Sequence, residues 1–276
     1  MELLTIDETR CKQDGICVME CPMSIIRLRE KNSFPEMVPG TSGICLKCGH
    51  CVAVCPHDAL RHQQIPIEDS PPLQKNLLID EDMTIQFLRS RRSIRVFKDQ
   101  PVERERLKKL INIASYAPTA RNAQSVEWIA ITEKNQVRRL SELVVNWMSE
   151  KLKADPNSLD APYIPMVIAA WKDGVDMVLR NAPALLVASA PQESINGLVD
   201  VTINLTYLEL AALSMGLGTC WAGMFKTALN NCPSLKEIVG IPARHSHFYA
   251  MMIGYPKFKY YRLPARKLPQ ITWREC

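Results

Sequence analysis

The feature that most constrains this chain is a dense run of cysteines near its start. Seven of the ten cysteines lie between Cys11 and Cys55. Two segments of this run align without a gap: Cys11-Lys-Gln-Asp-Gly-Ile-Cys-Val-Met-Glu-Cys-Pro22 and Cys45-Leu-Lys-Cys-Gly-His-Cys-Val-Ala-Val-Cys-Pro56. The second copy has the spacing Cys-x2-Cys-x2-Cys-x3-Cys-Pro, whereas the first has Asp14 at the second cysteine position. The cysteines therefore form a repeated motif.

The start of the chain bears on the chemical state of these cysteines. Residues Met1 to Asp7 lack the basic region and apolar core of a signal peptide. No apolar run approaches the roughly 20 residues that cross a bilayer. We therefore expect a cytoplasmic protein that does not contact a membrane. A disulfide framework is not expected there, so the clustered cysteines predict metal ligands.

The spacing of the second copy is that of bacterial iron–sulfur proteins, and residues 5–65 resemble a bacterial two-cluster ferredoxin. Gly15 and Gly49 hold the same register, where a side chain would crowd the backbone against a cluster. The resemblance implies crossed ligand sets, with Cys45, Cys48, Cys51 and Cys21 for one cluster and Cys11, Cys17 and Cys55 for the other. A zinc site is the alternative, but zinc is typically held by two separated pairs of ligands.

Asp14 is the departure from this pattern. Its carboxylate is expected either to ligate iron weakly or to leave a three-iron cluster with an empty corner. The sequence therefore predicts one 4Fe-4S cluster and a second cluster that is 4Fe-4S or 3Fe-4S. The five histidines, His50 and His57 among them, need no function.

Composition and charge indicate two parts of different character. We expect a ferredoxin-like domain over residues 1–65, a proline-rich linker over 66–80 and a second domain over 81–276. Residues 1–70 carry seven Lys and Arg against ten Asp and Glu, a net charge of −3, and the remainder carries +8. The basic residues are scattered apart from one group at 89–95, which argues against a nucleic-acid partner.

The second domain alternates helical and strand patterns, which predicts an α+β fold. Helices are expected over Thr84–Arg89, from Asp99 to before Pro118, and over Val199–Leu217, the last apolar on nearly all sides and so central or interfacial. Strands are expected over Trp128–Thr132, Ala184–Ala190 and His247–Ile253, and Tyr163–Trp171 is another run of strand length.

Three segments of this domain carry polar or glycine-rich patterns. Arg91-Arg92-Ser93-Ile94-Arg95 could receive a dianionic phosphate, or could be a solvated basic turn. Residues 117–124 form a loop after a proline, with amide side chains that could meet a heterocycle. Residues 216–223 do not match a dinucleotide-binding fingerprint and fit a tight helix-to-strand turn. Each segment is a weak signal by itself.

In this order, and with the tail over residues 263–272, the three segments resemble the FMN-dependent nitroreductase superfamily over residues 82–276. One departure follows Gln124, where Ser125 and Val126 replace the Pro-Trp common in that family. The resemblance implies a central sheet flanked by helices and a homodimer with FMN in each interface. It leaves residues 140–180 open, where the family varies and often builds a substrate lid.

The resemblance also implies the cofactor-binding residues. The FMN phosphate and ribitol would be met by Arg91, Arg92, Ser93 and Arg95, with Arg266 or Lys267 from the tail. The flavin would be contacted by Pro118, Thr119, Ala120, Asn122 and Gln124, and its ring system lined by Cys220, Trp221, Ala222 and Gly223. No catalytic side chain is expected, because flavin N5 performs the transfer and the protein supplies placement and electrostatics.

Taken together, the sequence predicts an oxidoreductase that passes electrons between two iron–sulfur clusters and FMN. The expected acceptor is a nitroaromatic, a quinone or a similar electrophile, and the expected donor is ferredoxin or NAD(P)H. The alternative is a non-enzymatic electron-transfer or redox-sensing module whose flavin never meets a substrate.

Overall fold

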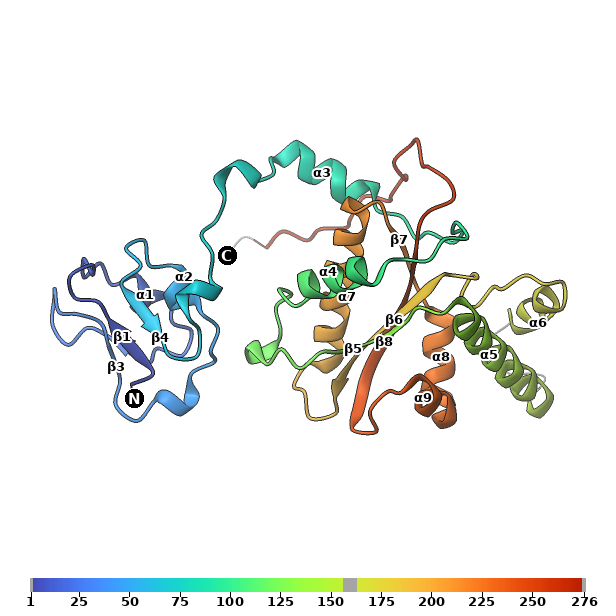
Figure 1. Cartoon of the computed structure of the whole chain (residues 1–276), viewed down its shortest axis with the longest axis horizontal. Helices are drawn as coiled ribbons and strands as arrows, with labels where there is room; N and C mark the ends of the chain where they lie inside the picture. The colour runs from blue at the N-terminus through green and yellow to red at the C-terminus, as the bar shows by residue number, and fades with distance from the viewer. Residues whose placement is uncertain (1, 156–162, 275–276) are drawn as a thin grey trace. The chain divides into compact units, whose positions relative to one another are not determined.

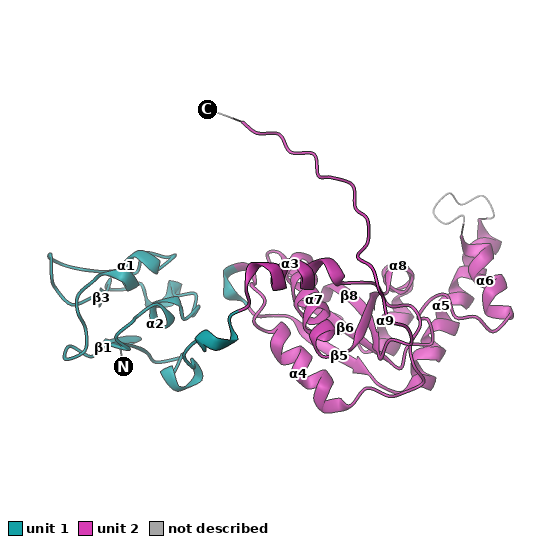
Figure 2. Cartoon of the chain, turned by 90° about the horizontal axis from the view of Figure 1, so that it is seen from above, with its two compact units in different colours: residues 1–78, 121–123 teal, residues 79–120, 124–276 magenta. Residues whose placement is uncertain are grey.

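The computed structural model describes residues 2–155 and 163–274, and the chain divides into two compact units (Figures 1 and 2). The first unit comprises the described part of residues 1–78 together with 121–123, and the second the described part of 79–120 and 124–276. Residues 156–162, inside the segment 140–180 that the family resemblance leaves open, lie outside the described residues. Within the described ranges, no helix is both long and apolar enough to cross a membrane.

The first unit is built from very short elements. Strand β1 (Leu4–Ile6) pairs antiparallel with β4 (Leu60–His62), which brings the two ends of the unit together. Strand β2 (Ile26–Arg27) pairs with β3 (Glu36–Met37). Between the strands lie helix α1 (Ile16–Glu20), the single turn η1 (Ser42–Ile44) and helix α2 (His50–Ala53). Its buried apolar residues are few: Leu4, Cys17, Ile25, Ile26, Val52 and Leu60.

The connection to the second unit has little regular structure. It contains the single turns η2 (Ile67–Asp69) and η3 (Lys75–Leu77), followed by helix α3 (Glu81–Ser90). The Asp80 carboxylate accepts a hydrogen bond from Met83 N at 2.8 Å and caps α3. The helix expected over Thr84–Arg89 is therefore confirmed and is longer than expected.

The second unit is organised around an antiparallel sheet with the strand order β5-β6-β8-β7. These strands are β5 (Glu127–Ile131), β6 (Ala184–Pro191), β7 (Gly218–Trp221) and β8 (His245–Gly254). The strands expected near Trp128, Ala184 and His247 are confirmed. Strand β6 is buried along its whole length, because helices cover both faces of the sheet (Figure 1).

The two faces carry separate hydrophobic clusters, and β6 contributes alternate residues to each. Leu186 and Ala188 pack with α4 (Arg104–Ala114) and α7 (Gly197–Ser214). Leu185 and Val187 pack in the other cluster, to which four further helices contribute: α5 (Lys134–Ala154), α6 (Ile164–Lys172), α8 (Gly223–Asn231) and α9 (Pro233–Val239). This two-sided burial confirms the α+β fold with a central sheet.

Two elements differ from expectation. The apolar run Tyr163–Trp171 is not a strand but the helix α6, with Pro165 in its first turn, where proline is favoured. Helix α4 begins at Arg104 rather than at Asp99, because Val102 is buried and the chain stays extended through Glu103. In both runs the apolar residues are locally compatible with the expected structure and with the observed one. Packing against the rest of the unit therefore determines which structure forms.

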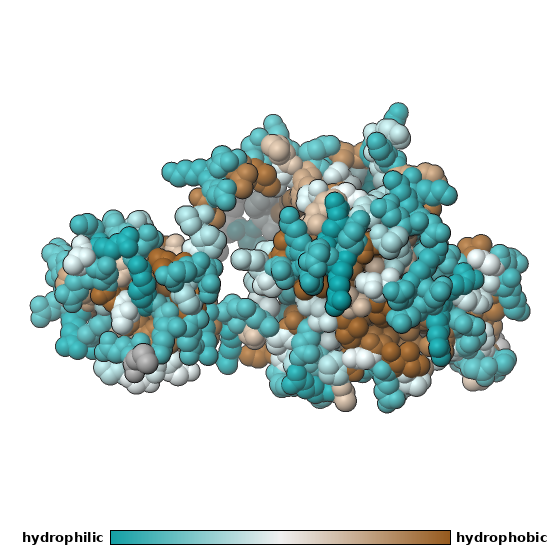
Figure 3. All heavy atoms as spheres, viewed as in Figure 1, coloured by the Kyte–Doolittle hydropathy of each residue, from teal (hydrophilic) through white to brown (hydrophobic). Residues whose placement is uncertain are grey.

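Helix α7 is central, as expected, but one side of it reaches the surface. Leu205 and Leu208 are fully buried, whereas Leu198, Val199 and Tyr207 are 46%, 54% and 40% exposed. Figure 3 shows that hydrophobic residues also come to the surface elsewhere on the second unit. The helix therefore carries an apolar face that the rest of the described chain does not cover.

Candidate functional site

The two cysteine segments of the first unit repeat in backbone conformation as well as in sequence. Left-handed residues recur 34 positions apart, in the pairs Gln13 and Lys47, Gly15 and Gly49, and Ser24 and Asp58. Gly15 and Gly49, with φ of 70° and 74°, each precede a short helix. The same backbone turns therefore present both sets of cysteine side chains.

One cavity of the first unit is lined by Cys21, Cys45, Cys48 and Cys51. Cys21 belongs to the first segment and the other three to the second, so the structure brings together the crossed set implied by the ferredoxin resemblance. His62, from β4, lines the same cavity and places Nε2 3.6 Å from Cys45 Sγ. Four thiols around one cavity form a donor set that fits an iron–sulfur cluster.

A second cavity is lined by Cys11, Cys17, Cys55 and Asp14. It is the counterpart of the first cavity, with a carboxylate at the position of the fourth thiol. Asp14 Oδ1 accepts a hydrogen bond from Ile16 N at 3.2 Å. Three thiols and one carboxylate fit either a three-iron cluster or a four-iron cluster with one oxygen ligand.

The thiols of the first unit repel one another as thiolates. Burial raises the pKa of Cys17 to about 11, and the neighbouring Cys55 and Cys11 thiolates add to the rise. The pKa of Cys51 is also raised to about 11 by burial and by Cys48. Cys17 and Cys51 therefore hold protons when no metal is bound, and metal binding must displace those protons.

The basic residues of segment 91–95 point to different places. Arg91 donates from Nη1 to Glu209 Oε1 at 2.9 Å, and Glu209 is 5% exposed on α7. The same carboxylate accepts from Trp221 Nε1 at 3.1 Å and from Thr219 Oγ1 at 3.4 Å. Glu209 was not predicted as a site residue, although an acid in the largely apolar second half of this helix was a signal that could have identified it.

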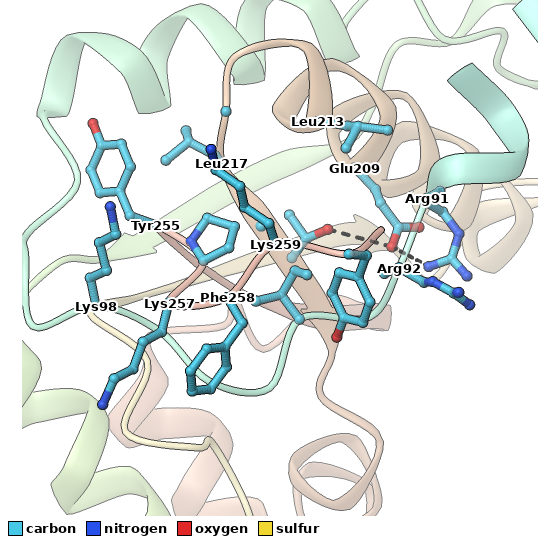
Figure 4. A pocket seen from close by; sticks show the side chains of 16 residues that line it. Arg91, Arg92, Lys98, Glu209, Leu213, Leu217, Tyr255, Lys257, Phe258 and Lys259 are labelled. Atoms are coloured by element: carbon cyan, nitrogen blue, oxygen red, sulfur yellow. Dashed lines mark hydrogen bonds and ion pairs between the residues drawn. The ribbon is translucent and has the colours of Figure 1, made fainter. Parts of the chain in front are cut away.

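Arg91 and Arg92 line an open cavity of about 520 Å³ in the second unit (Figure 4). Arg92 Nη2 donates to Arg262 O at 3.0 Å and its guanidinium lies over the Tyr260 ring. Arg92 Nε is buried and has no hydrogen-bond partner among the described residues. Lys98 and Lys259 add positive charge to the wall. An orphaned guanidinium donor in a basic cavity suits an anionic group.

Ser93 and Arg95 lie beside Cys220 instead. Ile94 N donates to Thr219 O at 2.8 Å, so this segment docks against the start of β7. Gly218 is required there, because a Cβ would approach Ile94 Cγ1 to 2.5 Å. Burial raises the pKa of the Cys220 thiol, while the charge of Arg95 and a hydrogen bond from Ser93 oppose the rise. Arg91, Arg92 and Ile94 therefore line the cavity, whereas Ser93 and Arg95 lie near Cys220.

The segment 220–223 runs from the sheet into α8. Cys220 and Ala222 are buried, and Ala222 N donates to Ala250 O at 3.0 Å. The Trp221 and Tyr249 rings meet edge to face, with their centroids 5.0 Å apart. Gly223 begins α8. The tight helix-to-strand turn expected over residues 216–223 lies at its start, where Gly216 has φ of 71° between the end of α7 and β7, and the following residues form the strand.

The loop expected to contact the flavin is stabilised by its own polar groups. Ala120 N donates to Asp200 Oδ1 at 3.1 Å, and Gln124 N donates to Thr119 Oγ1 at 3.0 Å. Asn122, which groups with the first unit, donates from Nδ2 to the carbonyl oxygens of Leu46 and Lys47. Pro118 precedes this short turn.

The tail residues assigned to the FMN phosphate do not lie with the other predicted FMN-binding residues. Arg266 donates only to the neighbouring Ala265 O, at 3.0 Å, among the contacts seen in the described chain. Neither Arg266 nor Lys267 lines the 520 Å³ cavity, whose lining ends along the chain at Tyr260. Their assignment to the FMN phosphate stays a prediction.

Comparison with known proteins supports both parts of this description. Residues 88–255 match the model of the nitroreductase family. Residues 9–59 match the model of a 4Fe-4S dicluster domain. The two matches cover the second-unit sheet and the two cysteine segments respectively.

Individual relatives are similar mainly to the second unit. A protein of Archaeoglobus fulgidus, provisionally named as an NADH dehydrogenase/NAD(P)H nitroreductase, is 27% identical over 173 residues, which are 63% of this chain and 85% of the relative. An FMN reductase [NAD(P)H] of Bacillus subtilis is 27% identical over 190 residues, 67% of this chain and 70% of the relative. A Bacteroides fragilis nitroreductase solved with bound FMN shares the fold, with a TM-score of 0.59, 18% identity and coverage of 71% of this chain and 100% of that chain.

Proposed function

The chain belongs to the nitroreductase family and carries an N-terminal 4Fe-4S dicluster domain, and on this basis we propose that it is an FMN-dependent oxidoreductase fed through two iron–sulfur clusters. The clusters exchange electrons singly and FMN exchanges them singly or in pairs. The proposed acceptor is a small electrophilic organic molecule, such as a nitroaromatic or a quinone. The observation that carries the proposal is that one chain combines two cysteine-lined cavities with a nitroreductase fold.

The first unit is proposed to hold the clusters. Cys21, Cys45, Cys48 and Cys51 would bind one 4Fe-4S cluster, and Cys11, Cys17 and Cys55 would bind the other, with Asp14 at its remaining corner. The shared backbone turns of the two segments support two clusters of the same kind of geometry. The mutual repulsion of the thiols supports a cationic occupant.

The second unit is proposed to hold FMN. Ser93, Arg95 and residues 220–223 lie together, and we assign them to the ribitol and the ring system. The partnerless Nε of Arg92 supports an anion in the basic cavity that Arg91 and Arg92 line. Arg91 is already paired with Glu209, so we assign it to positioning this wall as well as to the phosphate.

A homodimer is proposed on the exposed face of α7. Leu198 and Val199 are about half exposed there, and burying them against a second copy removes apolar surface from water. The loop 118–124 of the partner would then be available to complete each FMN site. A dimer also gives each site access to two sets of clusters.

The proposed donor is reduced ferredoxin or NAD(P)H. The names of the relatives from Archaeoglobus fulgidus and Bacillus subtilis support a nicotinamide donor. The dicluster domain supports a one-electron donor. The two donors would enter at different units of the chain.

An anaerobic assay with NADH, NADPH and reduced ferredoxin against a panel of nitroaromatics and quinones tests the proposal. We expect turnover with at least one donor and acceptor, lost when FMN is removed and restored when FMN is added back. The contrary result is that every donor reduces the flavin but no acceptor makes its reoxidation faster than in oxygen-free buffer alone. In that case the chain is an electron-transfer module and the proposed enzymatic function is wrong.

A further inference from the structure

The cavity lined by three thiols and Asp14 is also lined by His57, a residue for which the sequence predicted no function. His57 lies two residues after Cys55 and lines the cavity formed by Cys11, Cys17, Cys55 and Asp14. Its Nε2 lies 3.4 Å from Asp14 Oδ2. The imidazole and the carboxylate therefore meet at the corner where the thiolate is absent.

The repeat within the chain supplies an internal control. The position equivalent to His57 in the first segment is Met23, two residues after Cys21. Met23 lines the other cavity, which four thiols already surround. A nitrogen donor thus occurs at this position only beside the cavity that lacks its fourth thiol.

The two donor atoms lie together at the cavity that lacks a thiol. His57 Nε2 and Asp14 Oδ2 are 3.4 Å apart as an ion pair, and both residues line this cavity. A corner iron that already holds three sulfides becomes five-coordinate when both a nitrogen and an oxygen bind it. Asp14 Oδ1 is held by Ile16 N, which leaves Oδ2 free to face the cavity.

We propose that His57 is an iron ligand, binding together with Asp14 at the corner of the second cluster that lacks a cysteine. This assignment rests on the proposed function, because it requires the second cluster. It defines that corner as an oxygen and nitrogen site, unlike the other corners, which are thiolate sites. The remaining ligands, Cys11, Cys17 and Cys55, keep the roles already given to them.

Pulsed EPR on the reduced full chain, labelled with 15N-histidine and prepared without oxygen, tests the proposal. We expect a strongly coupled 15N nucleus in the parent protein, absent in His57→Met and retained in the matched control His50→Met. In the presence of a chelator, both proteins should lose one iron atom. His57→Met should lose it at a rate at least roughly tenfold higher than the parent protein. His57→Cys should hold the fourth iron with no nitrogen coupling.

The possible failures are distinguishable. A parent protein that shows two clusters but no strongly coupled histidine nitrogen overturns the role of His57. Coupling that persists in His57→Met overturns it as well. A parent protein with a single cluster refutes the proposed function itself, before any variant is measured.

Discussion

The two units of this chain build their sites in opposite ways. In the first unit, the cysteines around each cavity come from two segments of twelve residues, and the same backbone turns are used twice. In the second unit, Glu209 on α7 meets Arg91 from one distant segment and Trp221 from another. The first unit should therefore depend on its metals and the second on a few long-range polar contacts.

Removing Glu209 should produce the largest effect on the second unit. Glu209→Ala leaves Arg91 and Trp221 Nε1 without their acceptor. We expect a loss of about 3 kcal/mol of unfolding free energy, near the low end for breaking a buried pair, because the Arg91 side chain is 31% exposed. For a unit of this size the thermal midpoint should fall by about 6–12 °C.

Both units can be followed in that experiment. All five tryptophans lie beyond residue 120, so tryptophan fluorescence reports the second unit, and the visible absorbance of the clusters reports the first. Glu105→Ala is the control, because Glu105 is 79% exposed in its pair with Lys108 and should change little. An unchanged midpoint in Glu209→Ala would show that the second unit does not depend on this contact.

The next effect concerns FMN retention. Arg95→Ala removes a guanidinium beside Cys220, and the FMN dissociation constant should rise about 10–100-fold, as expected for a charge-assisted contact. Arg95 is a cleaner choice than Arg91, because Arg91→Ala also leaves Glu209 unpaired. Flavin fluorescence titration measures the change.

The control for Arg95 is Arg89→Ala, in the last turn of α3. The cluster absorbance should be the same in both variants. An unchanged FMN dissociation constant in Arg95→Ala would show that the basic segment is a solvated turn.

The contrast between the units also explains what the sequence could predict. The cysteine segments are local, so their spacing and the ferredoxin resemblance that it supports predicted the cysteines around both cavities. The strands and helix α7 were predicted because apolar patterns mark buried elements. The Glu209 contacts join residues 118 and 12 positions apart, and no local pattern encodes them.

Packing decided the remaining differences. Tyr163–Trp171 is apolar enough for either a strand or a helix, and it forms α6 because it packs in the cluster with α5. The side chains of segment 91–95 are divided between the 520 Å³ cavity and the surroundings of Cys220, and this division depends on the docking of Ile94 against Gly218. Such pairings depend on the whole fold.

Within the first unit, Asp14→Cys should make the two clusters alike. A carboxylate holds cluster iron less firmly than a thiolate, so in the parent the cluster at Cys11, Cys17 and Cys55 should decay first in air. With the thiolate restored, the two decay rates should converge, as followed by EPR during exposure to oxygen. Clusters that decay together in the parent would remove any special role for Asp14.

The smallest effect concerns a partly buried cation in the second unit. Burial, with the nearby charge of Lys236, lowers the pKa of Lys226 to about 8 from its ordinary 10.5. Above pH 8 the folded chain releases this proton while the unfolded chain keeps it, so stability should rise with pH between about 8 and 10.5.

The comparison for Lys226 is with Lys226→Met, which lacks the titrating group. The parent should gain less than about 1 kcal/mol relative to this variant between pH 8 and pH 10, because the group is only partly buried. Thermal unfolding at several pH values, with Lys108→Met as an exposed control, measures the gain. A constant difference between parent and Lys226→Met would contradict the lowered pKa.

The central claim is that the clusters of the first unit deliver electrons to the flavin of the second. Anaerobic stopped-flow measures it directly: a low-potential one-electron donor reduces the clusters while flavin absorbance is followed. The account predicts flavin reduction at a rate independent of protein concentration, and its loss in a Cys45→Ser, Cys48→Ser variant that still binds FMN. Flavin reduced equally fast in that variant would contradict the claim.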